Sequence, residues 1–224
     1  MTTHQTFKPT KKIVNRILSI VDCGLTKGAG KPIAGQLCVE AAICLALGLP
    51  HGDEPPCVGA AVRSFKIALN DSQWSSDKAR AKGMRKLAIA QLGSDSIDQN
   101  LFVKELTLAT IRKIVPLALR AAAKINPKHS KSLESHAVKC ELIGDDLNAA
   151  SDAARAASDA ASDAASDAAR AASYAASYAA SDAASDASDK VLTLMADIGL
   201  EALIKCKSPG CKWLFLCNPP KAQP

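Results

Sequence analysis

The sequence predicts an all-α protein, a multi-helix bundle with a long alanine-rich helix packed on it. Apolar residues recur at steps of three and four along most of the chain, which is the periodicity of an amphipathic helix. No run alternates apolar and polar residues with β-branched enrichment, so no sheet is expected. Residues 151–189 hold 19 alanines and no glycine or proline, and alanine is the strongest helix former.

Glycine and proline divide the first 144 residues into six expected helices. They are Lys11–Val21, Ile33–Leu47, Val58–Leu69, Asp77–Leu92, Ile97–Val115 and Lys131–Ile143. Pro32 suits the first turn of the second helix, and Ser75 or Ser76 is placed to cap the fourth. Gly93 follows the fourth helix as a C-terminal cap would. We expect Pro116 to kink or divide the chain after the fifth helix, because proline removes a backbone donor.

The remaining residues differ in composition, which suggests a second domain. We expect a basic helical head over residues 1–144, and an alanine-rich long helix with a C-terminal segment over 145–224. After the repeat, 191–205 returns to an ordinary amphipathic pattern and should be helical. Residues 208–210 should end that helix, and the apolar run 213–216 should fold back onto the core.

Charge is distributed unevenly along the chain. Residues 1–139 hold 21 Lys and Arg against 10 Asp and Glu, and residues 140–224 hold 7 against 12. This asymmetry indicates either a polyanionic partner for the first part or a basic head partly neutralised by its own acidic tail. The start of the chain is polar, and no apolar stretch is long enough to span a bilayer. We therefore expect a cytoplasmic protein with no membrane segment, whose eight cysteines are thiols.

The alanine-rich block repeats the unit Ser-Asp-Ala-Ala, which places paired alanines on one helix face and Asp and Ser on another. Small side chains let helices approach closely. The face would therefore either cover this protein's own core or bind a protein partner or a second copy. Tyr174 and Tyr178 replace Asp at two successive turns and are expected to act as packing side chains.

One cluster of polar residues suggests a catalytic site. Glu40 lies inside the most apolar predicted helix, where a carboxylate must find a partner or stay protonated. His51 and Asp53 follow on a proline-rich loop that ends at Cys57, and His51 with Cys57 could form a base–nucleophile pair. The alternative is a structural network in which Glu40 pairs with Arg63 or Lys66 and fixes the loop. The sequence favours this alternative.

A second cluster suggests a nucleic-acid site. The predicted helix from residue 77 is basic and an aromatic residue precedes it, so a phosphate backbone is a candidate ligand. The candidate residues are Trp74, Lys78, Arg80, Lys82, Arg85 and Lys86.

No metal or cofactor is expected. The glycines between Gly24 and Lys31 do not have phosphate-loop spacing, and Pro32 stands where that loop needs Ser or Thr. The gaps between Cys206, Cys211 and Cys217 do not match the close pairs of a zinc site.

The stretches GQLCVEAAICLALGLPHGDEPPCV, RSFKIALND and WSSDKARAKGMRKLAIAQLGS resemble a family of uncharacterised bacterial and phage-borne hypothetical proteins. The resemblance covers residues 35–95 and implies a bacterial or phage setting, with no catalytic residue to carry over. The alanine repeat is also similar to repeats in helical proteins described as immunity proteins.

These observations favour a non-enzymatic helical interaction module that binds another protein. Immunity and anti-defence are the roles that we consider for such a module. The alternatives are a hydrolase-like enzyme with its site on the 49–57 loop, and a nucleic-acid binder that uses the basic helix at 77–92.

Overall fold

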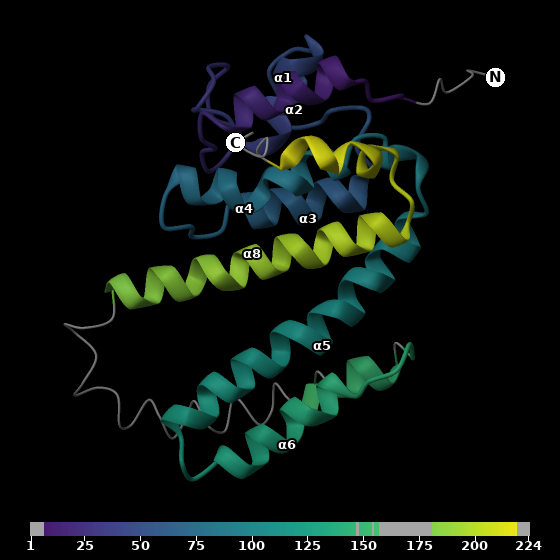
Figure 1. Cartoon of the computed structure of the whole chain (residues 1–224). Coiled ribbons are helices and arrows are strands. Elements are labelled where there is room, and N and C mark those ends of the chain that lie inside the picture. The colour runs from purple at the N-terminus through teal and green to yellow at the C-terminus, as the bar shows by residue number, and fades with distance from the viewer. Residues whose placement is uncertain (1–6, 147, 154, 157–180, 219–224) are drawn as a thin grey trace, which may run out of the picture. The chain divides into compact units, whose positions relative to one another are not determined.

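The computed structural model describes residues 7–146, 148–153, 155–156 and 181–218. All regular structure in these residues is helical and none is a strand, which confirms the all-α prediction (Figure 1). The chain forms two compact units. Unit 1 comprises residues 1–103 and 185–224, and unit 2 comprises residues 104–184. This grouping differs from the division expected at residue 144, because the C-terminal helices belong with the first hundred residues.

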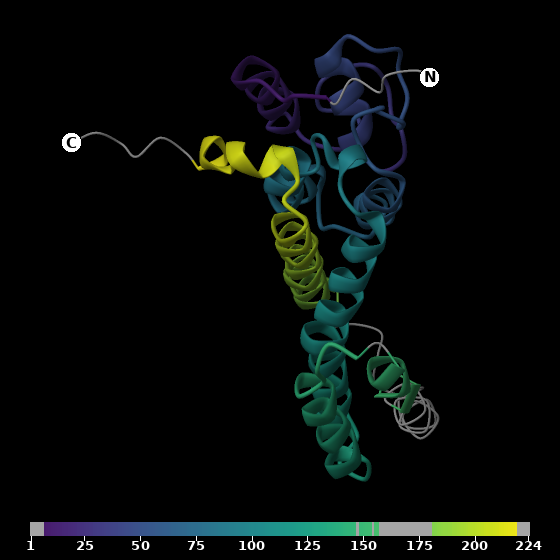
Figure 2. The same ribbon diagram turned by 90° about the vertical axis from the view of Figure 1, so that its right-hand side faces the viewer.

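Unit 1 is organised around helix α4 (Asp77–Ala90). Its other helices are α1 (Lys11–Val21), α2 (Val39–Leu47), α3 (Ala60–Asn70), the 3₁₀ turn η1 (Ser94–Ser96), the part of α8 (Ser181–Lys205) from residue 185 on, and the 3₁₀ helix η2 (Pro209–Cys217). Helix α4 contacts α1, α2 and η2, and both ribbon views place η2 beside it (Figures 1 and 2). Met84 and Ile89 are wholly buried in this core.

Helix α2 begins six residues later than predicted. Gly35 has φ of +83°, a left-handed conformation that interrupts a helix, and Gly30 pairs with Leu37 in an isolated antiparallel bridge. Cys38 then caps α2, because its Sγ accepts a hydrogen bond from the backbone N–H of Ala41. Residues 22–38 therefore form a glycine-containing loop that ends against α2.

Several predicted boundaries are confirmed. Helix α1 spans the predicted residues, and Ser76 is the residue that caps α4 through the N–H of Ala79. Gly93, in contrast, does not cap α4: that helix ends at Ala90 with Gln91 as its C-cap, and Gly93, with φ of +81°, precedes η1 and donates its N–H to the Cys57 carbonyl.

Unit 2 contains most of helix α5 (Gln99–Ile125) and all of α6 (Ser130–Glu141). Of the two outcomes expected at Pro116, a kink or a division of the chain, division is wrong, because Pro116 lies inside one continuous helix of 27 residues. Residues on both sides of the proline, including Leu108 and Leu119, are buried in one cluster with Leu133 of α6. This packing offsets the hydrogen bond that proline removes.

The C-terminal segment folds back onto unit 1 as expected, but only in part. The indole Nε1 of Trp213 donates to the Pro9 carbonyl at 3.1 Å, and Cys217 is buried. Phe215, in contrast, is 61% exposed. The predicted helix at 191–205 is confirmed within α8, while residues 157–180 of the alanine repeat, including Tyr174 and Tyr178, lie outside the described residues.

Candidate functional site

Glu40 is completely buried in α2 and forms an ion pair with Lys66 of α3, which is also completely buried. The Lys66 Nζ atom lies 3.2 Å from Glu40 Oε1. Burial raises the pKa of Glu40, and the charge of Lys66 opposes that rise; burial likewise lowers the pKa of Lys66, opposed by Glu40. Lys66 is therefore the partner of Glu40, and it is one of the two partners that the sequence predicted.

The pair is incompletely hydrogen-bonded. Neither carboxylate oxygen of Glu40, nor Lys66 Nζ, makes a hydrogen bond of normal geometry to a described residue. Gln91, at the end of α4, is close enough to lower the pKa of Glu40, yet its buried amide also lacks a hydrogen-bond partner there. Buried polar atoms without partners are uncommon and often mark a place for water or a ligand.

A cavity of about 70 Å³ adjoins this pair. Asn70 and Asp71, where α3 ends, hold the glycine-containing loop against it. Asp71 Oδ1 accepts from the Gly28 N–H at 2.8 Å, and Asn70 Nδ2 donates to the Thr26 carbonyl at 2.9 Å. The cavity is lined by Gly28, Ala29, Cys38, Val39, Glu40, Asp53, Ile67, Asn70 and Asp71.

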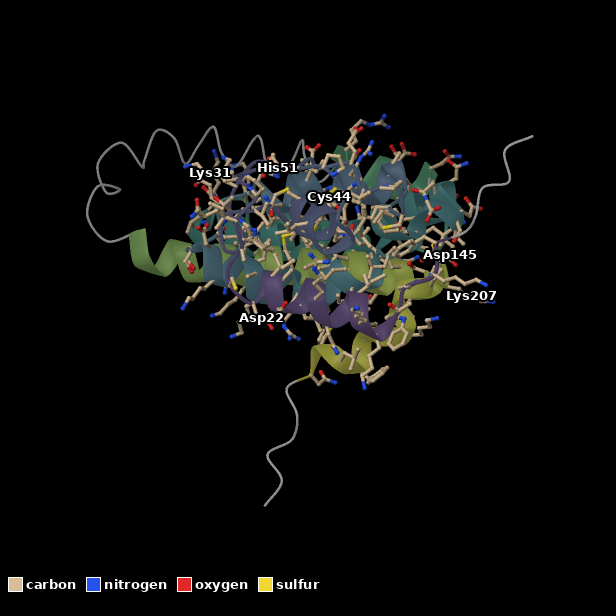
Figure 3. The ribbon with its side chains drawn as sticks, turned by 90° about the horizontal axis from the view of Figure 1, so that it is seen from above. Asp22, Lys31, Cys44, His51, Asp145 and Lys207 are labelled. Atoms are coloured by element: carbon tan, nitrogen blue, oxygen red, sulfur yellow. The ribbon has the colours of Figure 1, made fainter. Side chains whose placement is uncertain are left out.

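The predicted catalytic residues are only partly brought together. Glu40 and Asp53 both line the cavity, whereas His51 is exposed with Nε2 3.1 Å from the Gly30 carbonyl oxygen, beside Lys31 in Figure 3. Cys57 is buried, and burial raises the pKa of its thiol to about 12. No hydrogen bond joins His51 to Cys57 among the described residues. A protonated thiol without a base is a poor nucleophile, so this geometry does not support acyl transfer at Cys57.

A second feature of unit 1 is a basic groove of about 770 Å³ between α4, α8 and η2. Four of its lining residues are cationic: Lys82, Arg85, Lys86 and Lys190. Two are acidic, Asp189 and Asp197. Asp189 is already engaged, since its Oδ1 accepts from the Ser75 N–H at 2.9 Å. By count the lining has two more positive than negative side chains, although one of the cations, Arg85, is paired with Asp22.

Three of the predicted nucleic-acid residues form a stripe along α4. Lys78, Lys82 and Lys86 are all exposed and stand four residues apart, which places them on one face of the helix. Within the described part of the chain none of the three makes an ion pair. We call these residues the lysine stripe; Lys82 and Lys86 line the basic groove.

The other three predicted residues have structural roles. Arg80 is 6% exposed, and its guanidinium donates to the carbonyls of Asn70 and Leu25 and to Asp77. Arg85 pairs with Asp22 at 2.6 Å and also donates to the Cys217 carbonyl. Trp74 is 8% exposed and its Nε1 donates to the Leu69 carbonyl; the residue also lines the basic groove, but as a nearly buried part of its wall. Arg80 is therefore a fold-stabilising residue, contrary to its place in the predicted site.

Helix η2 supplies candidate residues that the sequence prediction missed. Lys212 and Phe215 are three residues apart in η2 and are both exposed, and residues at this spacing align along one side of a 3₁₀ helix. Asn218, the extended residue that follows η2, lines the basic groove, so the C-terminal end of η2 meets the groove. We call Lys212 and Phe215 the η2 ridge. The sequence shows that an aromatic residue, Phe215, follows Lys212 at a spacing of three. It does not show that η2 packs against α4.

Metal binding and membrane insertion find no support in the described residues. No group of three or more His, Cys, Asp or Glu side chains among them could hold a metal ion. The helices described are too short or too polar to cross a bilayer.

Two of the three C-terminal cysteines are held as thiols by their surroundings. Burial raises the pKa of the Cys211 thiol to about 11, and burial also raises the pKa of the Cys217 thiol.

Comparison of the chain with protein-family models, curated proteins and solved structures finds no match. The resemblance described for residues 35–95 therefore stays a prediction.

Proposed function

We propose that unit 1 is a non-enzymatic module that binds single-stranded nucleic acid along the basic groove. The observation that carries this proposal is the lysine stripe, whose three ammonium groups are exposed and two of whose members, Lys82 and Lys86, line a groove of about 770 Å³. Four helical residues span about 6 Å, a spacing comparable to that of consecutive phosphates on an extended strand. Lysines at this spacing can each contact one phosphate.

The charge of the whole chain supports the same proposal. Unit 1 contains 18 Lys and Arg against 12 Asp and Glu, while unit 2 contains 10 of each kind. The net charge of +6 therefore resides in the unit that carries the groove. A local excess of positive charge raises the concentration of a polyanion near the surface and speeds its association.

The η2 ridge favours a single strand over a duplex. Phe215 is 61% exposed, and its ring lies 6.0 Å from that of Trp213 in a tilted arrangement. Lys212 lies over the Trp213 ring at 5.4 Å. Proteins that bind single strands combine a cationic groove with aromatic rings on which unpaired bases stack. In a duplex the base faces are already stacked, so an exposed phenyl ring adds little.

The test is fluorescence anisotropy of a labelled oligothymidine and of a duplex, from about 50 mM to about 200 mM salt. We expect single-strand binding that weakens with salt, with Lys82→Ala reducing the slope of log K against log salt by about 0.7. Phe215→Ala should weaken single-strand binding about 5- to 150-fold, the equivalent of about 1–3 kcal/mol of stacking, and Phe215→Tyr should restore it.

The matched control is Lys31→Ala, which removes the same charge from an exposed residue of unit 1 that does not line the groove. It should leave the affinity nearly unchanged. Salt-independent binding, preference for the duplex, or binding only to an acidic peptide or an anionic vesicle would each contradict the proposal.

A further inference from the structure

The cavity beside Glu40 is rich in hydrogen-bond acceptors and poor in donors. Three carboxylates line it, those of Glu40, Asp53 and Asp71. The side-chain amide of Asn70 is already engaged, because Oδ1 accepts from the Val39 N–H and Nδ2 donates to Thr26 and Asp71. The Gly28 N–H is likewise used by Asp71. A ligand that fits this chemistry must bring donors and positive charge.

The acceptors themselves are under-used. Asp53 makes no hydrogen bond or ion pair to another described residue, and it is partly exposed at the cavity. Glu40 is completely buried and lines the same cavity, and although Lys66 approaches Oε1, neither oxygen accepts a hydrogen bond there. Lys66 supplies the counter-charge of this buried carboxylate but no hydrogen bond of normal geometry, so the Glu40 oxygens keep acceptor capacity that a ligand in the cavity could use.

We propose that this cavity binds the head group of a small organic cation, an ammonium or guanidinium, between Glu40, Asp53 and Asp71. The volume of about 70 Å³ admits a head group of a few heavy atoms. Gly28 and Asp53 are partly exposed and Ala29 is exposed, so a longer aliphatic chain could leave the cavity on that side. A bare metal ion fits less well, since the described carboxylates do not form a group that could coordinate one.

The head group would complete the buried ion pair electrostatically. With the cation bound, three carboxylates face two positive charges, those of the ligand and of Lys66. Charge-assisted hydrogen bonds from N–H groups to carboxylates are about twice as strong as neutral ones, so even a small ligand can bind selectively. This site is separate from the basic groove, because the two share no lining residue.

The experiment is a ¹H–¹⁵N NMR titration of the full chain with methylguanidinium and, separately, with methylammonium. We expect saturable shifts at millimolar concentration or below, centred on Gly28, Ala29 and Asp53. Tetramethylammonium, which has the charge but no N–H donor, should cause none of these shifts. Asp53→Asn should weaken binding about tenfold or more, because it removes a charged acceptor from a partly exposed position where the fold tolerates an amide.

The matched control is Asp95→Asn, which removes the same charge from an exposed residue of unit 1 outside the cavity. Equal weakening by Asp53→Asn and Asp95→Asn would indicate only a general charge effect and would overturn the proposal. Absence of shifts with both cations would leave water as the only occupant and would overturn it as well. Tighter binding of Mg²⁺ or Ca²⁺ at the same residues would do the same.

Discussion

The ion pair of Glu40 and Lys66 stabilises unit 1 only while both members are present. Both side chains are completely buried, so each would be an uncompensated charge without the other. Desolvation of two ions offsets much of their attraction, and the net contribution of the intact pair is therefore small. Loss of one member is a different matter, because the desolvation cost remains and the attraction disappears.

We predict that Lys66→Met lowers the free energy of unfolding by about 3–5 kcal/mol near pH 7. Burial already raises the pKa of Glu40, and loss of Lys66 removes the group that opposes the rise. In the folded variant Glu40 therefore stays protonated at pH values above about 4.3, where the carboxyl of the unfolded chain has already lost its proton. The free energy of unfolding then falls as pH rises from about 4.3 toward the raised pKa of Glu40. Urea denaturation should therefore show a smaller loss near pH 5 than near pH 7.

The control for this prediction is Glu40→Met combined with Lys66→Met. Replacing both ions with apolar side chains of similar volume leaves no buried charge, so the double variant should be more stable than Lys66→Met alone. A loss in Lys66→Met that is the same at both pH values would show that packing, rather than the charge of Glu40, sets the cost.

At the scale of elements, two glycines allow α8 to pack closely in unit 1. A Cβ atom built on Gly83 of α4 would lie 2.4 Å from the Trp74 ring and 3.3 Å from Thr193 of α8. One built on Gly199 of α8 would lie 2.3 Å from the Phe65 ring. These contacts place Thr193 and the neighbouring groove residues of α8 beside α4, so the groove depends on them.

We predict that Gly83→Ala destabilises the protein, although alanine is favoured over glycine in a helix by about 1 kcal/mol. Trp74 is nearly buried and hydrogen-bonded to Leu69, so its ring cannot move aside without loss. Overpacking of this kind costs about 1–3 kcal/mol, which should exceed the gain in helix propensity. Thermal or urea unfolding measures the difference.

A double-mutant cycle with Trp74→Phe tests this explanation, because phenylalanine lacks the ring atoms of Trp74 that approach Gly83. In that background Gly83→Ala should cost much less than in the natural sequence, or should stabilise the helix. An equal cost in both backgrounds would show that Trp74 is not the obstructing group.

The elements also show what the sequence could and could not predict. Periodicity and caps predicted α1 and α4 because these signals are local, whereas the late start of α2 depends on the bridge between Gly30 and Leu37. Pro116 lies within α5 because packing against α6 outweighs a local rule. The sequence predicted that Glu40 pairs with Arg63 or Lys66, because a carboxylate in an apolar helix requires a partner, but it did not choose between the two cations.

The groove and the cavity, in contrast, are made by residues far apart in the sequence. Lys190 and Asn218 line the groove with α4 only because the chain returns to unit 1 after unit 2. The composition of α4 suggests that Arg80 is a surface cation, but its side chain is buried because two carbonyls outside α4, those of Asn70 and Leu25, accept its hydrogen bonds. Helical spacing places a side chain on a face and does not determine what covers that face.

At the scale of the whole molecule, the effect of where the positive charges lie can be tested separately from the effect of the total net charge. Unit 1 has a net charge of +6 and unit 2 has none, so the formal charge of the chain equals that of unit 1. If the protein attracted polyanions only through its total charge, any equal loss of charge would weaken binding equally. If the lysine stripe contacts phosphates, the position of the lost charges decides the outcome.

We predict that replacing Lys78, Lys82 and Lys86 with Glu abolishes single-strand binding at about 150 mM salt. The matched variant replaces Lys124, Lys131 and Lys139 of unit 2, which are also exposed, with Glu. Each variant lowers the net charge from +6 to zero, because every substitution changes the charge by two. Anisotropy with the same oligothymidine should show binding near the natural level for the unit 2 variant. Equal losses in the two variants would contradict a localised site, since total charge alone would then account for the attraction.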